Sequence, residues 1–187
     1  MLRPLILWGG TDIDAKYYAK EPSKFNQNPD KTRDTKEFYM AKEAIKNGQP
    51  ILGICRGAQL QCILNGGTLI QHSEPEKNNH SLTCLKSYEE PNEFIEIPTA
   101  PGAHHQIMEP AGKHVVLGWN PNPTAVWLND NKWEIRTNCP EIIWWPETKC
   151  LGIQAHPEWA TKESKFIKYI NELLEQLNID YSFNNAY

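Results

Sequence analysis

In the stretch Pro50-Ile51-Leu52-Gly53-Ile54-Cys55-Arg56-Gly57-Ala58-Gln59, a short apolar run is followed at once by a cysteine between two glycines. The run predicts a buried parallel strand, and the residues from Ala58 onward predict a helix. A strand, a tight turn and a helix in this order hold a nucleophile at the top of an α/β sheet. The turn requires small residues two positions either side of the nucleophile, and Gly53 and Gly57 fit. The stretch therefore indicates that Cys55 is a nucleophile, with a buried, inert cysteine as the alternative.

A second motif, far downstream, offers a base to this cysteine. The apolar run Leu151–Ile153 leads into Gln154-Ala155-His156-Pro157-Glu158. Pro157 disfavours helix at His156, so His156 and Glu158 are expected to project together from the end of a strand. A carboxylate beside a histidine selects its tautomer and supports its positive charge, so that the histidine can take a proton from a thiol. The two motifs together predict a Cys55–His156–Glu158 triad; an ordinary strand end with a His-Pro turn is the alternative.

The position of Cys55 directly before a predicted helix has an electrostatic consequence. The helix dipole and the unpaired backbone N–H groups of the first turn favour negative charge there. We therefore expect the Cys55 thiolate to be favoured.

The remaining sequence predicts the other elements of an α/β domain. Leu5–Trp8 predicts a strand that ends at Gly9-Gly10, and residues 11–34 predict a long loop with at most one helical turn. Apolar residues at helical spacing predict a crossover helix over Thr35–Asn47, capped by Asp34 or Thr35. Residues 71–92 predict a polar loop. Further strands are predicted at Thr68–Ile70, Glu93–Ile97, His114–Trp119, Thr124–Leu128, Lys132–Arg136 and Glu141–Trp145, and a closing amphipathic helix at Ala160–Leu177.

Six motifs in this order resemble one family over most of the chain. They resemble the class I glutamine amidotransferase-like superfamily, and more narrowly its γ-glutamyl hydrolase branch (peptidase C26 type), which includes γ-glutamyl-γ-aminobutyrate hydrolases. The motifs are Gly9-Gly10-Thr11-Asp12-Ile13, Arg33-Asp34 with Glu37, Gly53-Ile54-Cys55-Arg56-Gly57-Ala58-Gln59, Gly66-Gly67-Thr68-Leu69, His104-His105-Gln106, and Gly152 to Glu158.

The resemblance implies a fold. It implies an α/β, three-layer sandwich with a mostly parallel, flavodoxin-like central sheet, in a single domain over residues 1–187. Members of the family open with a strand–helix–strand unit before the Gly-Gly loop. Here that loop comes at residue 9. The N-terminal βα unit is therefore expected to be missing, which raises the prospect of a homodimer.

The resemblance also implies roles for particular residues. The backbone N–H groups of Gly10 and Arg56 are expected to form the oxyanion hole, and Gln59 to line the acyl pocket. His105 or Gln106 is expected to contact the substrate, with capping of a local turn as the rival role. Arg33 and Asp34 match a family pair, but a solvated pair at a helix cap is an equal alternative.

Composition excludes several classes of function. A formal net charge of −4 gives no reason to expect nucleic acid or an anionic membrane as a partner. No apolar stretch is long enough to span a bilayer, and the apolar N-terminus is too short for a secretory signal. Five cysteines without C-x-x-C spacing indicate reduced thiols in the cytoplasm. The spacing of His72 and His80 matches no recognisable set of metal ligands, so both histidines are expected to lie in a solvated loop. No metal and no cofactor are expected.

Three functions remain open. The first is hydrolysis of the γ-glutamyl amide bond of a small molecule, either glutamine or a γ-glutamyl amine, through a thioester on Cys55. The second is a glutaminase subunit that passes ammonia to a separate synthetase. The third is a catalytically silent binding module. The identity of the leaving group is not readable from the sequence.

Overall fold

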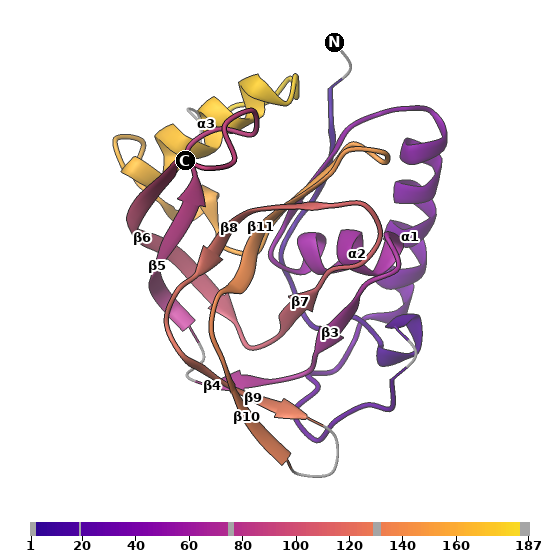
Figure 1. Ribbon diagram of the computed structural model, residues 1–187. Coiled ribbons are helices and arrows are strands. Elements are labelled where there is room, and N and C mark those ends of the chain that lie inside the picture. Colours follow the sequence, from indigo (N-terminus) through magenta and orange to yellow (C-terminus); the bar gives the residue numbers. More distant parts are fainter. Residues whose placement is uncertain (1–2, 19, 75–76, 129–131, 184–187) are drawn as a thin grey trace.

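A computed structural model describes residues 3–18, 20–74, 77–128 and 132–183, and its centre is a twisted seven-stranded sheet (Figure 1). The strand order across the sheet is β1-β2-β12-β11-β8-β5-β6. The strands are β1 (Leu5–Leu7), β2 (Ile51–Ile54), β12 (Cys150–Ile153), β11 (Cys139–Trp145), β8 (Val115–Asn120), β5 (Lys77–Leu85) and β6 (Phe94–His104).

The sheet is mixed rather than mostly parallel. Strands β1, β2 and β12 run parallel, with Gly53 opposite both Leu7 and Gly152. The pairs β12–β11, β11–β8, β8–β5 and β5–β6 are antiparallel. Parallel pairing requires a long crossover, usually a helix, whereas a short turn folds a strand back on its neighbour. Only four residues, 146–149, join β11 to β12, and Lys149 in this turn has a φ of 52°.

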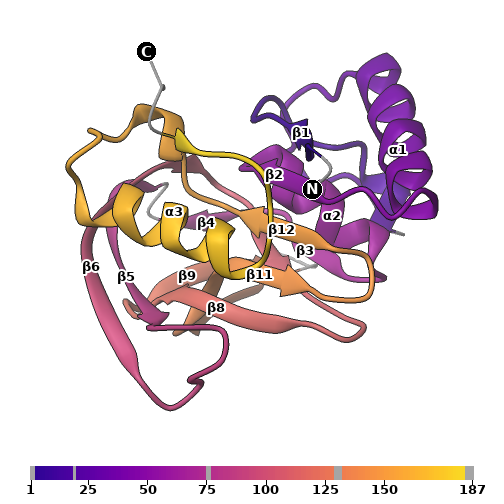
Figure 2. The same cartoon turned by 90° about the horizontal axis from the view of Figure 1, so that it is seen from above.

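Helices cover the parallel part of the sheet on both faces, which gives the predicted three layers (Figure 2). Helices α1 (Lys31–Lys46) and α2 (Arg56–Leu64) pack on one face over a core that includes Ile51. Helix α3 (Lys165–Gln176) packs on the other face over a core that includes Leu52 and Leu151. Neighbouring strand residues point to opposite faces, so every residue of the apolar run is buried.

Two smaller sheets and two 3₁₀ turns complete the described fold. The order β10-β9-β4 forms one sheet and the pair β3–β7 the other. The elements are β3 (Thr68–Ile70), β4 (Ser73–Glu74), β7 (Ile107–Glu109), β9 (Thr124–Leu128), β10 (Lys132–Arg136), η1 (Ala15–Tyr18) and η2 (Pro157–Trp159). Across the described ranges, no helix has the length and apolar character needed to cross a membrane.

The structure corrects the predicted start and cap of the first long helix and the predicted loop over residues 71–92. Helix α1 begins at Lys31 and is capped by Asp30, whose carboxylate accepts hydrogen bonds from the backbone N–H groups of Thr32 and Arg33. Asp34 and Thr35 therefore lie inside the helix, not at its cap. Residues 71–92 contain strands β4 and β5 in place of a polar loop. Strand β5 is stabilised by antiparallel pairing with β6, the next strand along the chain, and this pairing overrides its polar composition.

Candidate active site

Cys55 lies in the turn between β2 and α2 with a strained backbone. Its φ of 51° and ψ of −108° are unusual for a residue with a side chain. Its backbone N–H donates to the carbonyl of Ile153 at 2.7 Å, which ties the turn to β12. A Cβ on Gly53 would lie 2.6 Å from the carbonyl carbon and oxygen of Gly57. The small neighbours expected from the sequence are thus required by close packing of β2 against α2.

Gly57 is the tightest glycine of this turn, and its replacement is expected to destabilise the protein. A Cβ at this position would lie 2.0 Å from the Leu7 carbonyl oxygen, and backbone on β1 cannot rotate away. We expect Gly57→Ala to lower the free energy of unfolding by about 3 kcal/mol, measured by urea titration. Gly66→Ala is the control, because nothing lies within 4 Å of its Cβ position and only its φ of 84° opposes the change. Equal stability of the two variants would contradict the packing argument.

His156 and Glu158 form a close pair. The His156 Nδ1 donates to the Glu158 Oε1 at 2.7 Å. The imidazole also stacks on Trp159, with ring centroids 3.6 Å apart and an angle of 2° between the planes. Because Nδ1 carries the proton, Nε2 is left as the basic nitrogen. The pair comes not from a strand end, as expected, but from the η2 turn, in which Pro157 occupies the first turn and His156 the N-cap.

The Cys55 and His156 side chains both lie against the backbone of Gly9. A Cβ on Gly9 would lie 3.5 Å from Cys55 Cβ and 2.9 Å from His156 Cε1. Any side chain at position 9 would therefore collide with the imidazole. This role of Gly9 was not predicted, although the Gly-Gly pair was an available signal; only its neighbour Gly10 was given a role from the sequence.

A pocket of about 80 Å³ opens beside Cys55, and all three predicted substrate-contact residues line it. Gly10, Gln59, His105 and Gln106 all border this pocket together with Cys55. The lining residues that were not predicted from the sequence are Asp12, Gln27, Ala103 and His104. Asp12 belongs to the Gly-Gly-Thr-Asp-Ile motif, which could have identified it, whereas Gln27 lies in a stretch without any motif. His156 is not a lining residue.

A chain of polar side chains leads away from the pocket wall. The His105 Nε2 donates to the Asp12 Oδ1 at 3.1 Å, and the Nδ1 atoms of His105 and His72 are 3.1 Å apart. Phe25 stacks on His72, with centroids 3.9 Å apart. His105 thus bonds to residues distant in sequence, not only to a local turn. The solvated position expected for His72 is wrong, because it is buried under Phe25.

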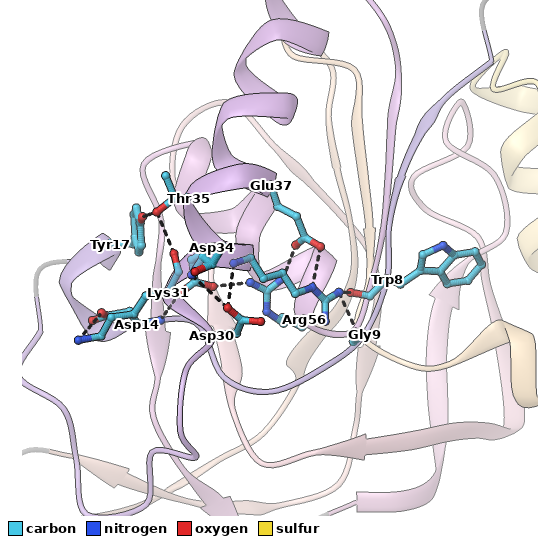
Figure 3. A network of polar contacts seen from close by, with 12 residues as sticks. Trp8, Gly9, Asp14, Tyr17, Asp30, Lys31, Asp34, Thr35, Glu37 and Arg56 are labelled. Carbon is cyan, nitrogen blue, oxygen red and sulfur yellow. Dashed lines mark hydrogen bonds and ion pairs between the residues drawn. The ribbon is translucent and has the colours of Figure 1, made fainter.

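An ion network links α1 to the Cys55 turn and to the Gly9 loop (Figure 3). Arg56, the residue after Cys55, is buried and contacts the carboxylates of Asp34 and Glu37. Asp34 is 0% exposed, which rules out the solvated-pair alternative. Arg33 donates to the carbonyls of Trp8 at 2.9 Å and Gly9 at 3.1 Å. The two arginines therefore position the backbone on either side of the pocket.

Comparison with known proteins shows the family of this chain. A family model described as Peptidase C26 matches residues 1–115, the range that contains the Gly9 loop, the Cys55 turn and most of the pocket wall. The chain belongs to the Peptidase C26 family.

Curated relatives agree with the family but are longer proteins. A Mycobacterium tuberculosis protein that carries the name of a glutamine amidotransferase is 34% identical over 180 residues, which cover 89% of this chain and 54% of that protein. A glutamine amidotransferase-like protein of Lactococcus lactis is 27% identical over 182 residues, covering 90% of this chain and 71% of the other. This Peptidase C26 chain thus spans about half of the first relative.

Solved structures agree on the fold. A Thermoplasma acidophilum protein that carries the name of a GMP synthase subunit superposes with a TM-score of 0.58 at 15% identity, covering 93% of this chain and 70% of that one. A Thermotoga maritima glutamine amidotransferase gives a TM-score of 0.51 at 16% identity, covering 86% and 63%. At these identities the likeness concerns the fold alone, and it confirms the predicted class I glutamine amidotransferase-like architecture.

Burial dominates the electrostatics of Cys55 in this Peptidase C26 site. It raises the pKa of the thiol to about 12, although a hydrogen bond from the Arg56 backbone opposes the shift. The negative charges of Glu158, Glu141 and Asp12 raise the pKa further. The helix start favours the thiolate as expected, through the Arg56 backbone N–H, but desolvation outweighs this effect and the net shift of the Cys55 pKa is upward.

The raised pKa predicts slow alkylation of Cys55 at neutral pH. Only the thiolate reacts with iodoacetamide, so the rate is expected to rise about tenfold per pH unit from roughly pH 6 to 10, without a plateau. Mass spectrometry of the Cys55 peptide gives the rate. Cys84 is the internal comparison, because burial raises the pKa of that thiol to about 12 as well. A plateau near pH 7 would show a preformed thiolate and contradict the argument.

Proposed function

We propose that the protein hydrolyses a γ-glutamyl amide bond, in glutamine or in a γ-glutamyl amine, and releases glutamate. The observation that carries this proposal is the carboxylate-paired His156 beside Cys55 at Gly9, with a small polar pocket next to the thiol. Peptidase C26 membership supports the same chemistry. In this proposal Cys55, His156 and Glu158 are the catalytic residues.

The first half of the reaction forms a thioester. The His156 Nε2 takes the proton of the Cys55 thiol as the sulfur attacks the γ-carbonyl carbon of the substrate. The backbone N–H groups of Arg56 and Gly10 hold the developing oxyanion. The Arg56 N–H belongs to the first turn of α2, whose N–H groups have no partner within the helix. The C–N bond then breaks, and the imidazolium gives its proton to the departing amine.

The second half hydrolyses the thioester. His156 takes a proton from water, the hydroxyl attacks the acyl carbon, and the sulfur leaves and recovers a proton, so that glutamate is released and the thiol restored. Glu158 keeps the His156 ring oriented and stabilises its positive charge in both halves. The raised pKa of Cys55 makes this proton transfer to His156 a required step, since the thiol is not ionised beforehand.

Pocket size favours recognition of the glutamyl moiety over the leaving group. A volume of about 80 Å³ beside Cys55 suits a compact acyl group, and we propose Gln59, His105 and Gln106 as its contacts because they line that space. Gln59 is itself oriented by Gln154, at 3.4 Å between Nε2 and Oε1. The leaving amine would lie outside the pocket, which leaves its identity open.

A second candidate function is that of a glutaminase subunit for a separate synthetase. Its support is the names of the structural neighbours, among them the GMP synthase subunit and PurLQS from Thermotoga maritima. Copurification of a synthetase, or glutaminase activity only after one is added, would favour it. A silent binding module is the third candidate, and a thioester trapped on Cys55 would exclude it.

The deciding experiment measures glutamate release from glutamine and from a panel of γ-glutamyl amines. Under the first proposal, at least one γ-glutamyl amine is hydrolysed well above glutamine by the protein alone. No glutamate release until a synthetase is added would replace the hydrolase by the subunit function, and release from glutamine alone would shift the balance toward that function. The protein can also be separated by size, and glutamate release measured in fractions of known molecular mass. This would establish whether the active form is a single chain or a homodimer.

Two further properties are proposed with this function. We propose that residues 1–187 act as one domain, because both faces of the sheet are covered by helices of the same chain. We also propose a cytoplasmic location, for which the support is that all five cysteines are free and buried. Fluorescence microscopy of a tagged protein tests the location.

A further inference from the structure

Three side chains distant in sequence meet behind the pocket wall: His80 on β5, His104 at the end of β6, and Glu141 on β11. One ligand atom from each lies within 4.8 Å of the others. Their side chains are 5%, 1% and 1% exposed respectively. The solvated position expected for His80 is therefore wrong, because pairing of β5 with β6 carries it into the interior.

The imidazole nitrogens of this cluster lack ordinary partners. Within the described residues, three buried imidazole nitrogens make no hydrogen bond of ordinary geometry: both nitrogens of His80 and the Nε2 of His104. Such groups are costly to bury unless something satisfies them. Both rings have a polar contact with the Glu141 carboxylate. Burial opposes its ionisation, but the two imidazoles keep it ionised by holding its pKa well below the usual range. The His80 Nε2 lies 3.3 Å from the Glu141 Oε1, and the His104 Nε2 lies 3.5 Å from the same oxygen. Both separations exceed the usual range for a hydrogen bond of this type.

The separations match those between ligands of one metal ion. Zinc bonds of about 2.0–2.1 Å in a tetrahedral arrangement place neighbouring ligand atoms about 3.3 Å apart. Two imidazoles and one carboxylate are a ligand set that zinc and related divalent transition metals accept, with a fourth position left for water.

The tautomer of His104 also favours a metal ion in this cluster. Its Nδ1 donates to the backbone carbonyl of Gln106 at 3.1 Å. The lone pair of a neutral His104 is then on Nε2 and faces the Glu141 carboxylate. Two electron-rich atoms at this distance repel unless a cation lies between them. An outer N–H bonded to a backbone carbonyl is also the arrangement that usually orients a metal-bound histidine.

Irregularities in strand pairing lie next to two of these side chains, Glu141 and His80. The β11–β8 register shifts between Pro140 and Ile142, which flank Glu141. The β5–β6 register shifts between His80 and Leu82. Such bulges redirect side chains and are found next to functional sites.

We propose that His80, His104 and Glu141 bind one divalent transition-metal ion, with Zn²⁺ the best fit. The ion would link β5, β6 and β11 and so hold the part of the pocket wall formed by His104. This is a structural site, separate from the thiol chemistry proposed for Cys55, and its test does not depend on activity. The alternative is that no metal binds and that a protonated histidine of the cluster balances the charge of the Glu141 carboxylate.

Metal content of the full chain provides the first test. The protein is stripped with a chelator, incubated with Zn²⁺, dialysed and measured by mass spectrometry of the metal. About one Zn²⁺ per chain is expected, and the melting temperature is expected to rise by roughly 5 °C or more at saturating Zn²⁺. Wild type that retains less than about a tenth of an equivalent overturns the proposal.

Variants locate the ion. Glu141→Gln and His80→Ala are each expected to lose the bound Zn²⁺ and its thermal effect. Cys55→Ala is expected to keep both, which excludes capture by the active-site thiol. His114→Ala is the matched histidine control, since its side chain bonds to the Gly112 carbonyl outside the cluster. Retention of stoichiometric Zn²⁺ by both cluster variants overturns the proposal.

If the variants do not fold, the visible absorption spectrum of the wild-type protein with bound Co²⁺ still tests the proposal. Co²⁺ in place of Zn²⁺ is expected to give visible bands typical of nitrogen and oxygen ligands. A thiolate-to-cobalt charge-transfer band would place the metal on cysteine and overturn the proposal. An imidazolium signal from His104 in Zn²⁺-treated protein, observed by nitrogen NMR, would establish the protonated alternative.

Discussion

Replacing Cys55 with alanine is expected to lower glutamate release by about 10⁴-fold or more, because the covalent route is lost while the pocket remains. Folding should be retained, since the side chain removed is small and alanine can occupy the same turn. The backbone φ of 51° burdens alanine and cysteine alike, because both carry a Cβ, so the substitution adds no backbone strain. The measurement is glutamate release by enzyme-coupled assay, with the best substrate of the γ-glutamyl panel, alongside circular dichroism of both proteins.

Cys62→Ala is the matched control for this prediction. Cys62 lies on the same helix as the active-site turn, is fully buried, and has a raised thiol pKa of about 12 like Cys55. Its sulfur lies near the Thr68 carbonyl, not near the pocket. Activity within a few-fold of wild type is expected. Full activity of Cys55→Ala would refute the nucleophile assignment, and equal losses in both variants would attribute the effect to stability.

Replacing Asp34 with asparagine is expected to lower the free energy of unfolding by about 3 kcal/mol, because it leaves the buried Arg56 guanidinium short of a counter-charge. Both side chains are essentially inaccessible, at 0% and 1% exposure. Asp34 also accepts the backbone N–H of Asp14 through its other oxygen, so the change loosens the loop before α1. Urea unfolding followed by fluorescence gives the difference.

The control for this prediction is an ion pair on the surface. Lys113 and Glu147 lie 3.8 Å apart with exposed fractions of 73% and 69%. Exposed pairs contribute little because water and salt screen them, so Lys113→Ala should leave the unfolding midpoint nearly unchanged. If Asp34→Asn behaved like Lys113→Ala, the Arg56 network would be incidental to stability. A loss of activity larger than the loss of folded protein would further indicate that the network positions the Arg56 backbone at the pocket.

Local chemistry explains why two parts of the candidate site could be predicted from the sequence. The Cys55 turn depends on residues two positions away, and the His156–Glu158 pair on a spacing of two, so both are readable from short segments. The prediction of a mostly parallel sheet is wrong because a four-residue turn folds β12 back on β11, and because β8 and β5 add further antiparallel pairs that no short segment indicates. Asp30 was missed as the cap because Asp34 and Thr35 offered equally good local candidates.

The sequence by itself determined the tight turn at Cys55, the α/β class and the family, because each can be recognised from short motifs whose residues are close together in the chain. Only the tertiary structure decided which polar residues are buried. For His72, His80 and Asp34 the sequence is compatible with a solvated position, but all three are buried. His72 packs under Phe25, and the pairing of β5 with β6 buries His80. Asp34 is buried against the Arg56 guanidinium. The same burial raises the Cys55 pKa. Desolvation depends on what surrounds a group from every side, and that surrounding is assembled from strands far apart in the sequence.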